Sequence, residues 1–454
     1  MAYLPNSPAD RQAMLEAVGV ATQRDLFASV PAGLMDPELR LPAPLGEQEL
    51  VVELQRLAAR NRPMGAYANF LGAGVYQRFI PAIVRATVAR PEFYTAYTPY
   101  QAEASQGTLQ TIFEFQSMLC ALTGMEVCNA SMYDGATSVA EAAMLAVAHT
   151  GRHRVAASAG LHPEALRVLH TYGAGRGVAV DVIPLREGRT DLDGVRAQVD
   201  SGHAALIVAQ PSFRGTLEEL APLAEAAHAA GALAVCAADP LACSVLVSPG
   251  EAGFDVVVGD CQTLGIPASF GGPHCGFVAA RAELVRGMPG RLVGMTGDAA
   301  GRRAYTLTLQ TREQHIRRER ATSNICTNHA LMALMATAYM ARMGAVGMAG
   351  VVTLAAQRAH HLADRLAAVE GLDLAHPRAP WLFEFTLRVP DDAATFAAGL
   401  RARGVLAGLP LAAVGAGESN ELLVCCTEMT APADIDRYVT AALAALAAPV
   451  GARA

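Results

Sequence analysis

The stretch ALIVAQPSFRGTLEELAPLAEAAHAAGALAVCAA, residues 205–238, decides the fold. Two short apolar runs at 205–210 and 232–238 flank an Ala-rich segment, 216–231, whose apolar residues recur at helical spacing. A strand, a helix and a second strand in this order form a unit in which the two strands run parallel. The stretch therefore predicts a parallel sheet covered by helices.

The same alternation continues on both sides of this stretch. Further candidate strands lie at 154–159, 178–185, 255–260 and 276–280, and further candidate helices at 135–151 and 162–175. We therefore expect an α/β fold with a doubly wound, mostly parallel sheet. A ligand of such a sheet binds at the carboxyl ends of its strands.

Three parts are expected along the chain. Residues 1–90 are predicted to form an N-terminal helical arm, 91–330 the large domain and 331–454 a small α+β domain. The segments that carry this division outside the large domain are helices at 45–61, from 329 and at 434–448, and strands at 381–389 and 421–429. The arm is rich in Gly, Pro and aromatic residues, so it is predicted to pack across a neighbouring chain.

Composition limits the function classes. Of 454 residues, 52% are hydrophobic and 17% charged, below the roughly 25% charged of an average soluble domain, so we expect an oligomer. The net charge of −7 argues against a nucleic-acid partner. Without an apolar run of about 18 residues or a signal-like start, the sequence predicts a cytoplasmic protein with no membrane partner. Nine cysteines without a CxxC pair predict reduced thiols and no metal site.

All 35 cationic side chains are arginine, and the chain contains no lysine. Codon bias explains most positions. The chemical consequence holds whatever the cause, because a guanidinium group stays protonated and cannot form a Schiff base with an aldehyde cofactor.

The segment YDGATSVAEA, residues 133–142, opens a helix with small residues. The backbone N–H groups at such a helix start attract an anion. Gly135, Thr137 and Ser138 are the candidate anion cradle, and ordinary helix capping is the alternative. By contrast, FLGAGVYQRF lacks the third glycine of a dinucleotide fingerprint.

Two further segments group polar side chains. YTAYTPYQAEASQGTLQ, residues 94–110, contains Tyr94, Tyr97, Tyr100, Gln101, Glu103, Ser105 and Gln106. Simple packing and a binding site are both open for this loop, because buried tyrosine hydroxyl groups need partners. LQTREQHIRRERATSNICTNHAL, residues 309–331, joins an arginine run to Thr322, Ser323 and Asn324. Such a run binds phosphate or carboxylate groups or forms a solvated face.

These segments together resemble glycine dehydrogenase (decarboxylating), the P-protein of the glycine cleavage system. The resemblance is to the N-terminal half, which two-component versions make as a separate alpha subunit, or subunit 1. It is carried by NFLGAGVYQRFIPAIV, YTAYTPYQAEASQGTLQ, MEVCNASMYDGATSVAEAA, VVVGDCQTLGIPASFGGPHCGF, QTREQHIRRERATSNICT and LLVCCTEMTAPADIDRYV. It implies a fold type I, pyridoxal phosphate (PLP)-dependent transferase-like architecture with a large doubly wound domain, a small C-terminal domain and an N-terminal arm.

The resemblance also implies that the alpha and beta subunits have different roles. The homologous beta subunit holds PLP on its lysine, and Gln262 stands near that position here, so this chain is expected to hold no covalent cofactor and no catalytic residue of its own. The implied activity is EC 1.4.4.2, present only with the beta subunit, in which glycine is decarboxylated and its aminomethyl group passes to the lipoyl arm of H-protein. An α2β2 assembly is expected.

The resemblance suggests roles for the polar segments. Thr322, Ser323 and Asn324 are expected to reach the partner's PLP phosphate, and the residues of the 94–106 loop to line the glycine pocket or the lipoyl channel. The alternative is a structural or regulatory scaffold that contributes no site residue. This sequence departs from the family pattern at Arg78, where the family usually has histidine, and at Met429, where lysine is common.

Overall fold

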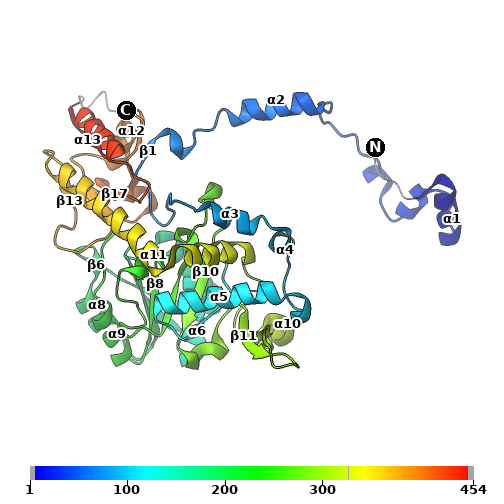
Figure 1. The fold of residues 1–454 in the computed structure, drawn as a ribbon, viewed down its shortest axis with the longest axis horizontal. Coiled ribbons are helices and arrows are strands. Elements are labelled where there is room, and N and C mark those ends of the chain that lie inside the picture. Colours follow the sequence, from blue (N-terminus) through cyan, green and yellow to red (C-terminus); the bar gives the residue numbers. More distant parts are fainter. Residues whose placement is uncertain (1–5, 326, 448–454) are drawn as a thin grey trace. The chain divides into compact units, whose positions relative to one another are not determined.

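The computed structural model describes residues 6–325 and 327–447. The chain divides into two compact units, the first ending at Arg62 and the second beginning at Pro63 (Figure 1). Residues 63–90 therefore fold with the second unit, while the domain boundaries expected at 90 and 330 stay predictions.

The regular part of the first unit consists of α1 (Pro8–Val18) and α2 (Glu47–Ala58). α2 confirms the helix predicted at 45–61. Every residue of both helices is at least partly exposed, including the apolar Leu50 and Leu54. A helix with an exposed apolar side is typical of a segment that packs on another chain.

The second unit is built on a seven-stranded sheet. Its strands are β2 (Val127–Cys128), β3 (Arg154–Ser158), β4 (Ala179–Ile183), β7 (His203–Gln210), β8 (Leu233–Ala238), β9 (Val256–Asp260) and β10 (Gly276–Ala280). Their order is β2-β10-β9-β8-β7-β3-β4. The five strands from β9 to β4 are parallel, and β10 is antiparallel to both neighbours. The six strands predicted in this region are confirmed.

The strand β7 shows how the sheet divides the core. All eight of its residues are buried. Leu206 and Val208 belong to one hydrophobic cluster, whereas Ala205 and Ile207 belong to another. Because successive side chains of a strand point to opposite faces, the two clusters lie on opposite faces, and the sheet is covered on both.

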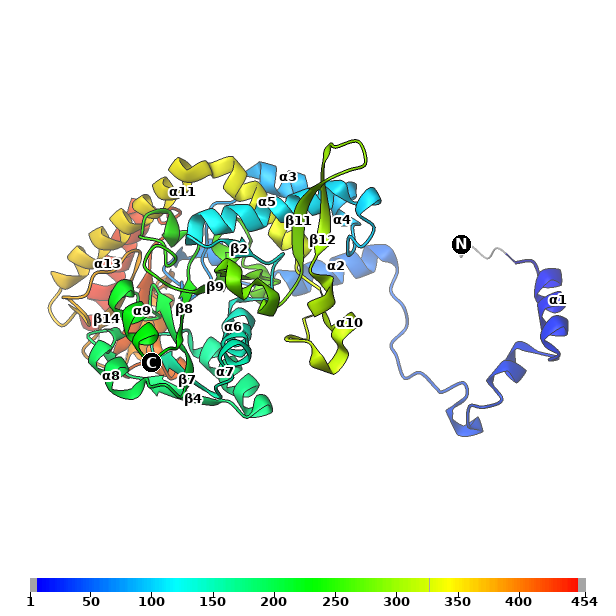
Figure 2. The same cartoon turned by 90° about the horizontal axis from the view of Figure 1, so that it is seen from below.

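Helices provide these covers (Figure 2). This part of the chain contains α3 (Ala82–Val88), α4 (Pro91–Tyr94), α5 (Gln106–Thr123), α6 (Gly135–Thr150), α7 (Pro163–Arg176), α8 (Leu192–Gln198), α9 (Leu220–Ala229) and α10 (Gln314–Arg317). Most buried residues of α6 and α7 belong to the cluster of Ile207, and most of those of α5 and α9 belong to the cluster of Leu206. The predicted helices at 135–151 and 162–175 are confirmed.

The helix predicted from residue 216 begins four residues later, at Leu220. The reason is a set of hydrogen bonds around Glu218. Its backbone N–H donates to Oε1 of Gln210 at 2.8 Å, and its carboxylate accepts from the backbone N–H and the hydroxyl group of Thr190. These partners hold residue 218 outside the helix.

The long helix α11 (Ala330–Ala367) follows the large sheet, and Gly344 interrupts it with φ 60° and ψ 179°. Only glycine adopts this conformation readily. By length and composition α11 could cross a membrane, which is weak support for a span. Its buried residues, such as Tyr339 and Val352, belong to the core cluster of Leu206.

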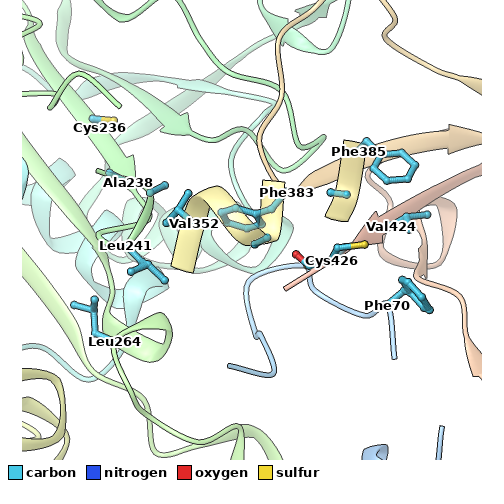
Figure 3. Close-up of a cluster of buried hydrophobic side chains, with 14 of the residues drawn as sticks. Phe70, Cys236, Ala238, Leu241, Leu264, Val352, Phe383, Phe385, Val424 and Cys426 are labelled. Carbon is cyan, nitrogen blue, oxygen red and sulfur yellow. The ribbon is translucent and has the colours of Figure 1, made fainter. Parts of the chain in front are cut away.

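The C-terminal part has an antiparallel sheet of its own. It consists of β13 (Asp373–Leu374), β14 (Glu384–Arg388), β16 (Leu409–Pro410) and β17 (Glu421–Cys425), with α12 (Ala393–Arg401) and α13 (Pro432–Ala447) beside it. The strands predicted at 381–389 and 421–429 and the final helix are confirmed, although residue 448 lies outside the described residues. Figure 3 shows Phe383 and Val424 of this part in one cluster with Cys236 of β8.

Four short elements and one hairpin complete the unit, and the sequence patterns did not reveal them. They are the parallel pair of β1 (Ala68–Asn69) and β15 (Val405–Leu406), the antiparallel pair of β5 (Leu185–Arg186) and β6 (Arg189–Thr190), and the hairpin of β11 (Leu292–Gly297) and β12 (Arg303–Thr308).

Candidate functional site

A pocket of about 340 Å³ opens at the carboxyl ends of β7, β8 and β9. The starts of α6 and α7 and the segment Gly74–Tyr76 complete its wall. This is the place where a doubly wound sheet binds its ligands, as expected from the sequence. The chemistry of the pocket therefore depends on the polar groups that line it.

Gln262 lies in the short 3-10 helix Cys261–Thr263 after β9, near the position where the resemblance places a lysine in the beta subunit. Its amide forms three hydrogen bonds of 2.9 Å: it accepts from the backbone N–H of Tyr76 and donates to the carbonyl oxygens of Tyr76 and Ile266. The residue is 1% exposed. Gln262 thus holds the segment around Tyr76 in place and supplies no amine.

The start of α6 is already occupied by carboxylates of the chain itself. The N–H of Gly135 donates to Oδ2 of Asp260 at 2.9 Å, and the N–H of Thr137 donates to Oδ1 of Asp134 at 2.7 Å. The Ser138 hydroxyl donates to the carbonyl oxygen of Asp134. A phosphate would have to displace Asp260, so the geometry favours the capping interpretation of these three residues.

Asp239 directly follows the neighbouring strand β8. Its Oδ1 accepts from the N–H of Leu241 at 2.9 Å and from the hydroxyl of Thr263 at 2.8 Å, while its Oδ2 is shielded from solvent and has no partner among the described residues. Burial raises the pKa of Asp239, and the charge of Arg78 opposes this rise. Sequence reasoning did not assign Asp239 a role.

Arg78 forms a buried ion pair with Glu428 at 2.8 Å, and both side chains are less than a tenth exposed. Glu428 also accepts from the N–H of Phe79. The pair joins the segment after β1 to the loop after β17. The departure from the family pattern at Arg78 is thus a structural ion pair, and Arg78 does not line the pocket.

Glu384 of β14 closes the wall near Tyr76. It accepts a hydrogen bond from the N–H of Ala73 at 2.7 Å and another from the Tyr76 hydroxyl at 2.6 Å. Burial raises the pKa of Glu384. Both carboxyl oxygens of Glu384 have partners within the chain. The group therefore stabilises the pocket wall formed by residues 73–76.

Two histidines also line the pocket. His162 accepts at Nδ1 from the N–H of Glu164, so its proton is on Nε2, which faces the carbonyl oxygen of Ala73 at 3.2 Å. Burial lowers the pKa of His162. His274 faces Asp260 at 3.7 Å, and this contact raises the pKa of His274.

The pocket does not fit PLP. Such a site needs an amine for the aldehyde and donors or cations for the phosphate. Gln262 has no amine, the α6 start holds Asp134 and Asp260, and the described lining residues include no arginine.

The loop of residues 94–106, here called the tyrosine loop, lies outside the pocket. Tyr94, at the end of α4, is 68% exposed, and Tyr97 is 85% exposed. Gln101 and Glu103 are exposed as well. These side chains are available to a second molecule, and none of them lines the pocket.

The structure brings this loop together with the arginine-rich segment. Arg291 donates to the Tyr100 hydroxyl at 2.9 Å, and the ring of His315 lies 6.2 Å from that of Tyr100. The Gln106 side chain pairs with both backbone groups of Tyr305 on β12, at 2.8 and 2.9 Å. Partly buried Ser105 is the residue before α5. Two segments that the sequence separates by 200 residues thus form one surface.

The segment around Ser323 lies beside α6 and α7. Arg176 of α7 donates to the Thr322 carbonyl oxygen at 3.0 Å, and Glu141 of α6 hydrogen-bonds to Ser323. Burial raises the pKa of Glu141 to about 7. Asn324 is exposed. The roles predicted for these residues at the partner's cofactor stay predictions.

Sequence reasoning missed Asp134, Asp260, Glu141 and Glu384. The first two had a local signal, since Asp134 precedes a predicted helix and Asp260 ends a predicted strand. Glu141 and Glu384 had none, because a glutamate inside a helix or strand pattern is typical of a solvated face.

The chain is similar to known proteins over nearly its whole length. The family model "Glycine cleavage system P-protein" matches residues 1–442. The "Probable glycine dehydrogenase (decarboxylating) subunit 1" of Thermomicrobium roseum is 46% identical over 97% of this chain and 99% of that protein. The protein of the same description from Brevibacillus brevis is 46% identical over 96% of both chains.

Solved structures agree with this result. A crystal structure of glycine decarboxylase (P-protein) of the glycine cleavage system in inhibitor-bound form superposes with a TM-score of 0.90 and 45% identity, covering 98% of this chain and all of that one. A sphingosine-1-phosphate lyase of Burkholderia pseudomallei superposes with a TM-score of 0.62 at 16% identity, over 90% of this chain and 93% of that one. The predicted fold type I architecture is confirmed.

Proposed function

The chain belongs to the glycine cleavage system P-protein family, as a subunit 1 of glycine dehydrogenase (decarboxylating), and from this premise we propose that it completes the active site of a separate subunit 2. The subunit 1 name implies a subunit 2 partner. In this proposal the PLP is held by subunit 2, which corresponds to the beta subunit.

One observation carries the proposal: Gln262 stands near the position where the resemblance places the cofactor lysine, and its buried amide forms three hydrogen bonds within the chain. The 35 cationic side chains are all arginine, so no other position supplies a lysine amine. The α6 start is occupied by Asp134 and Asp260. Because this pocket supplies no amine, we propose that the chain contributes to catalysis through the surface that contacts subunit 2.

The exposed residues suggest which surface this is. Tyr94 and Tyr97 project from a loop that Tyr100 and Gln106 anchor to the body of the unit. We propose that the loop lines the glycine pocket or the lipoyl channel of subunit 2. In the same way, Thr322, Ser323 and Asn324 approach the phosphate of the partner's PLP.

The reaction proposed for the assembly is decarboxylation of glycine and transfer of its aminomethyl group to lipoylated H-protein, in the cytoplasm. PLP on subunit 2 would withdraw electrons from the glycine carbon. The residues of this chain would orient glycine and the lipoyl arm and exclude water. A polar group positioned at the reacting centre favours the transition state only if it is held rigidly, which the anchors of the tyrosine loop provide.

An exposed apolar groove favours an α2β2 or similar hetero-oligomer. It has a volume of about 400 Å³ and is lined by α11 and by Phe79 and Met429, which are 57% and 45% exposed. Val346 of α11 is 89% exposed. Exposed apolar patches of this kind mark sites of protein association.

A structural or regulatory scaffold is the competing function. In that case this chain would stabilise subunit 2 and bind H-protein without touching glycine or PLP. Both functions require assembly, so assembly alone does not separate them.

Substitutions at two exposed positions test the proposal. Tyr97→Ala and Asn324→Ala, each mixed with subunit 2, should lower glycine–bicarbonate exchange by about tenfold or more, the effect of losing one positioning hydrogen bond. Tyr97→Phe removes the hydroxyl group and keeps the aromatic ring, so it shows which of the two affects the exchange rate. The matched control is Gln357→Ala on an exposed side of α11, which should leave exchange unchanged. Unchanged exchange in both test variants, with intact assembly, would favour the scaffold.

A further inference from the structure

A cluster of four side chains joins the tyrosine loop to the segment 309–331. Its members are Tyr100 of the loop, Arg291, which directly precedes β11, and Glu313 and His315 of the segment. Sequence patterns did not reveal the cluster, because 191 positions separate Tyr100 from Arg291. Since the members come from three separate stretches of the chain, their contacts determine how these stretches lie relative to one another.

Arg291 contacts both segments at once. Its Nη2 donates to the Tyr100 hydroxyl group at 2.9 Å, and its guanidinium group lies over the Tyr100 ring, 4.9 Å from the ring centre. In addition, Nε of Arg291 lies 3.7 Å from Oε2 of Glu313. A guanidinium group is planar and holds its donors in a fixed geometry. It therefore sets the orientation of its partners as well as their distance.

The position of Arg291 is itself fixed. Its side chain is 4% exposed and that of Glu313 is 6% exposed, so solvent screens the pair little. The carbonyl oxygen of Arg291 accepts from the N–H of Ala130 at 2.8 Å. Two residues later, both backbone groups of Val293 pair with the Gln116 side chain of α5 at 3.0 Å. Arg291 is thus a rigid point to which the two segments are attached.

His315 completes the cluster. Its Nδ1 lies 3.5 Å from Oε2 of Glu313, the same oxygen that faces Arg291. Its ring meets that of Tyr100 edge-on, with 6.2 Å between the ring centres. The four side chains therefore form a closed circuit of contacts. A displacement of one segment breaks contacts with the other.

The cluster lies next to the exposed part of the tyrosine loop. Between α4 and the short 3-10 helix Ala102–Ala104 the loop contains no helix or strand. The N–H of Tyr100 donates to the carbonyl oxygen of Thr98 at 2.9 Å. Thr98 directly follows Tyr97, which is 85% exposed. The contact of Tyr100 with Arg291 therefore restricts the part of the loop that carries Tyr97.

We propose that Arg291 is a positioning residue for the glycine reaction: through Tyr100 and Glu313 it holds the tyrosine loop and the start of the segment 309–331 in one arrangement against subunit 2. This inference rests on the proposed function, because it concerns the same surface. Arg291 is buried and acts through its partners. A misplacement of about 1 Å at a reacting centre lowers a rate by about a hundredfold, so such a residue affects turnover without touching glycine.

Amide hydrogen exchange of the full chain without subunit 2, followed by mass spectrometry, tests whether Arg291 holds the segments. Arg291→Met keeps an unbranched apolar stem and removes the guanidinium group. It should speed exchange in residues 95–101 and 311–317 by about tenfold or more, the effect of losing a hydrogen bond and a buried ion pair. Tyr100→Phe, a milder change, should speed exchange in residues 95–101. The matched control Arg286→Met, at an exposed position, should change neither segment.

Steady-state glycine–bicarbonate exchange with PLP-saturated subunit 2 tests the positioning role. In assembled Arg291→Met, kcat should fall by about tenfold or more, while KM for glycine changes by less than about threefold. Arg291→Lys should recover part of the loss, because an ammonium group keeps the charge facing Glu313 but lacks the planar donors. Adding Tyr97→Ala to Arg291→Met should lower kcat little further, because both substitutions act through the same side chain. A purely structural role would give additive effects.

Several results would overturn the proposal. These are unchanged amide exchange of residues 95–101 in both Arg291→Met and Tyr100→Phe, an unchanged kcat in assembled Arg291→Met, or additive effects of Arg291→Met and Tyr97→Ala. Loss of exchange in Tyr97→Ala with full exchange in Arg291→Met refutes only the role of Arg291. Full exchange in both Tyr97→Ala and Asn324→Ala refutes the proposed function itself and, with it, this role.

Discussion

At the scale of one residue, Gln262 lies directly after β9, near the position where the resemblance places the lysine of the beta subunit. Its buried amide forms three hydrogen bonds, and the two with Tyr76 hold that residue at the pocket wall. The sequence predicted the absence of the amine, because that depends on residue identity alone. It did not predict the structural role of the amide, because Tyr76, the partner in two of the three hydrogen bonds, lies 186 positions away in the sequence.

Gln262→Lys should not create a PLP site. The substitution removes the hydrogen bonds to Tyr76 and buries an ammonium group, so we expect the free energy of unfolding to fall by about 3 kcal/mol, as measured by urea denaturation. After addition of PLP and borohydride, intact mass should show no adduct. The exposed control Gln357→Lys should unfold like the unmodified chain. A stoichiometric PLP adduct on Gln262→Lys would contradict the account of the occupied α6 start.

Glu141 makes stability depend on pH. Burial raises its pKa from 4.5 to about 7 in the folded chain, so between these values the folded state holds a proton that the unfolded state has lost. Stability therefore falls as pH rises through this window, by up to about 3 kcal/mol, and is constant above it.

Glu141→Gln should remove this contribution. The measurement is the urea midpoint at several pH values between about 4.5 and 8, compared with the exposed control Glu283→Gln. The slope attributable to Glu141 should vanish in the first variant and persist in the second. An identical pH profile in Glu141→Gln and the unmodified chain would show that the carboxyl group is not held protonated.

At the scale of elements, some features of the start of α6 could be predicted from the sequence and others could not. The helix itself, its small first residues and its position after a strand were predictable from residues 133–142. Whether this helix start is capped or binds an anion could not be predicted. The answer depends on Asp260 at the end of β9, which accepts a hydrogen bond from the N–H of Gly135. Tertiary contacts of this kind also moved the start of α9 to Leu220.

Asp260→Ala should open the α6 start to anions. Without the carboxylate, the N–H of Gly135 has no partner from β9, and the helix start should attract phosphate. We expect phosphate to raise the melting temperature of Asp260→Ala by a few degrees and to leave the unmodified chain unchanged, relative to chloride at equal ionic strength. Equal stabilisation of both proteins by phosphate would show that Asp260 does not occupy the anion position.

At the scale of the whole molecule, the low charged fraction favours an oligomer, which stays a prediction. The structure leaves Phe79, Val346 and Met429 exposed, and such apolar side chains are available to a partner. The hairpin of β11 and β12 went unpredicted, although it carries the tyrosine loop through Tyr305 and Gln106. A surface assembled from distant segments leaves no short sequence pattern.

The most direct test of the central claim is the rate of glycine–bicarbonate exchange when subunit 2, saturated with PLP, is titrated with this chain. The account predicts no exchange with this chain alone, and a rate that rises with added chain until the two subunits are equimolar. Exchange by this chain alone, or full exchange by subunit 2 before any of this chain is added, would contradict the claim that it completes the partner's active site.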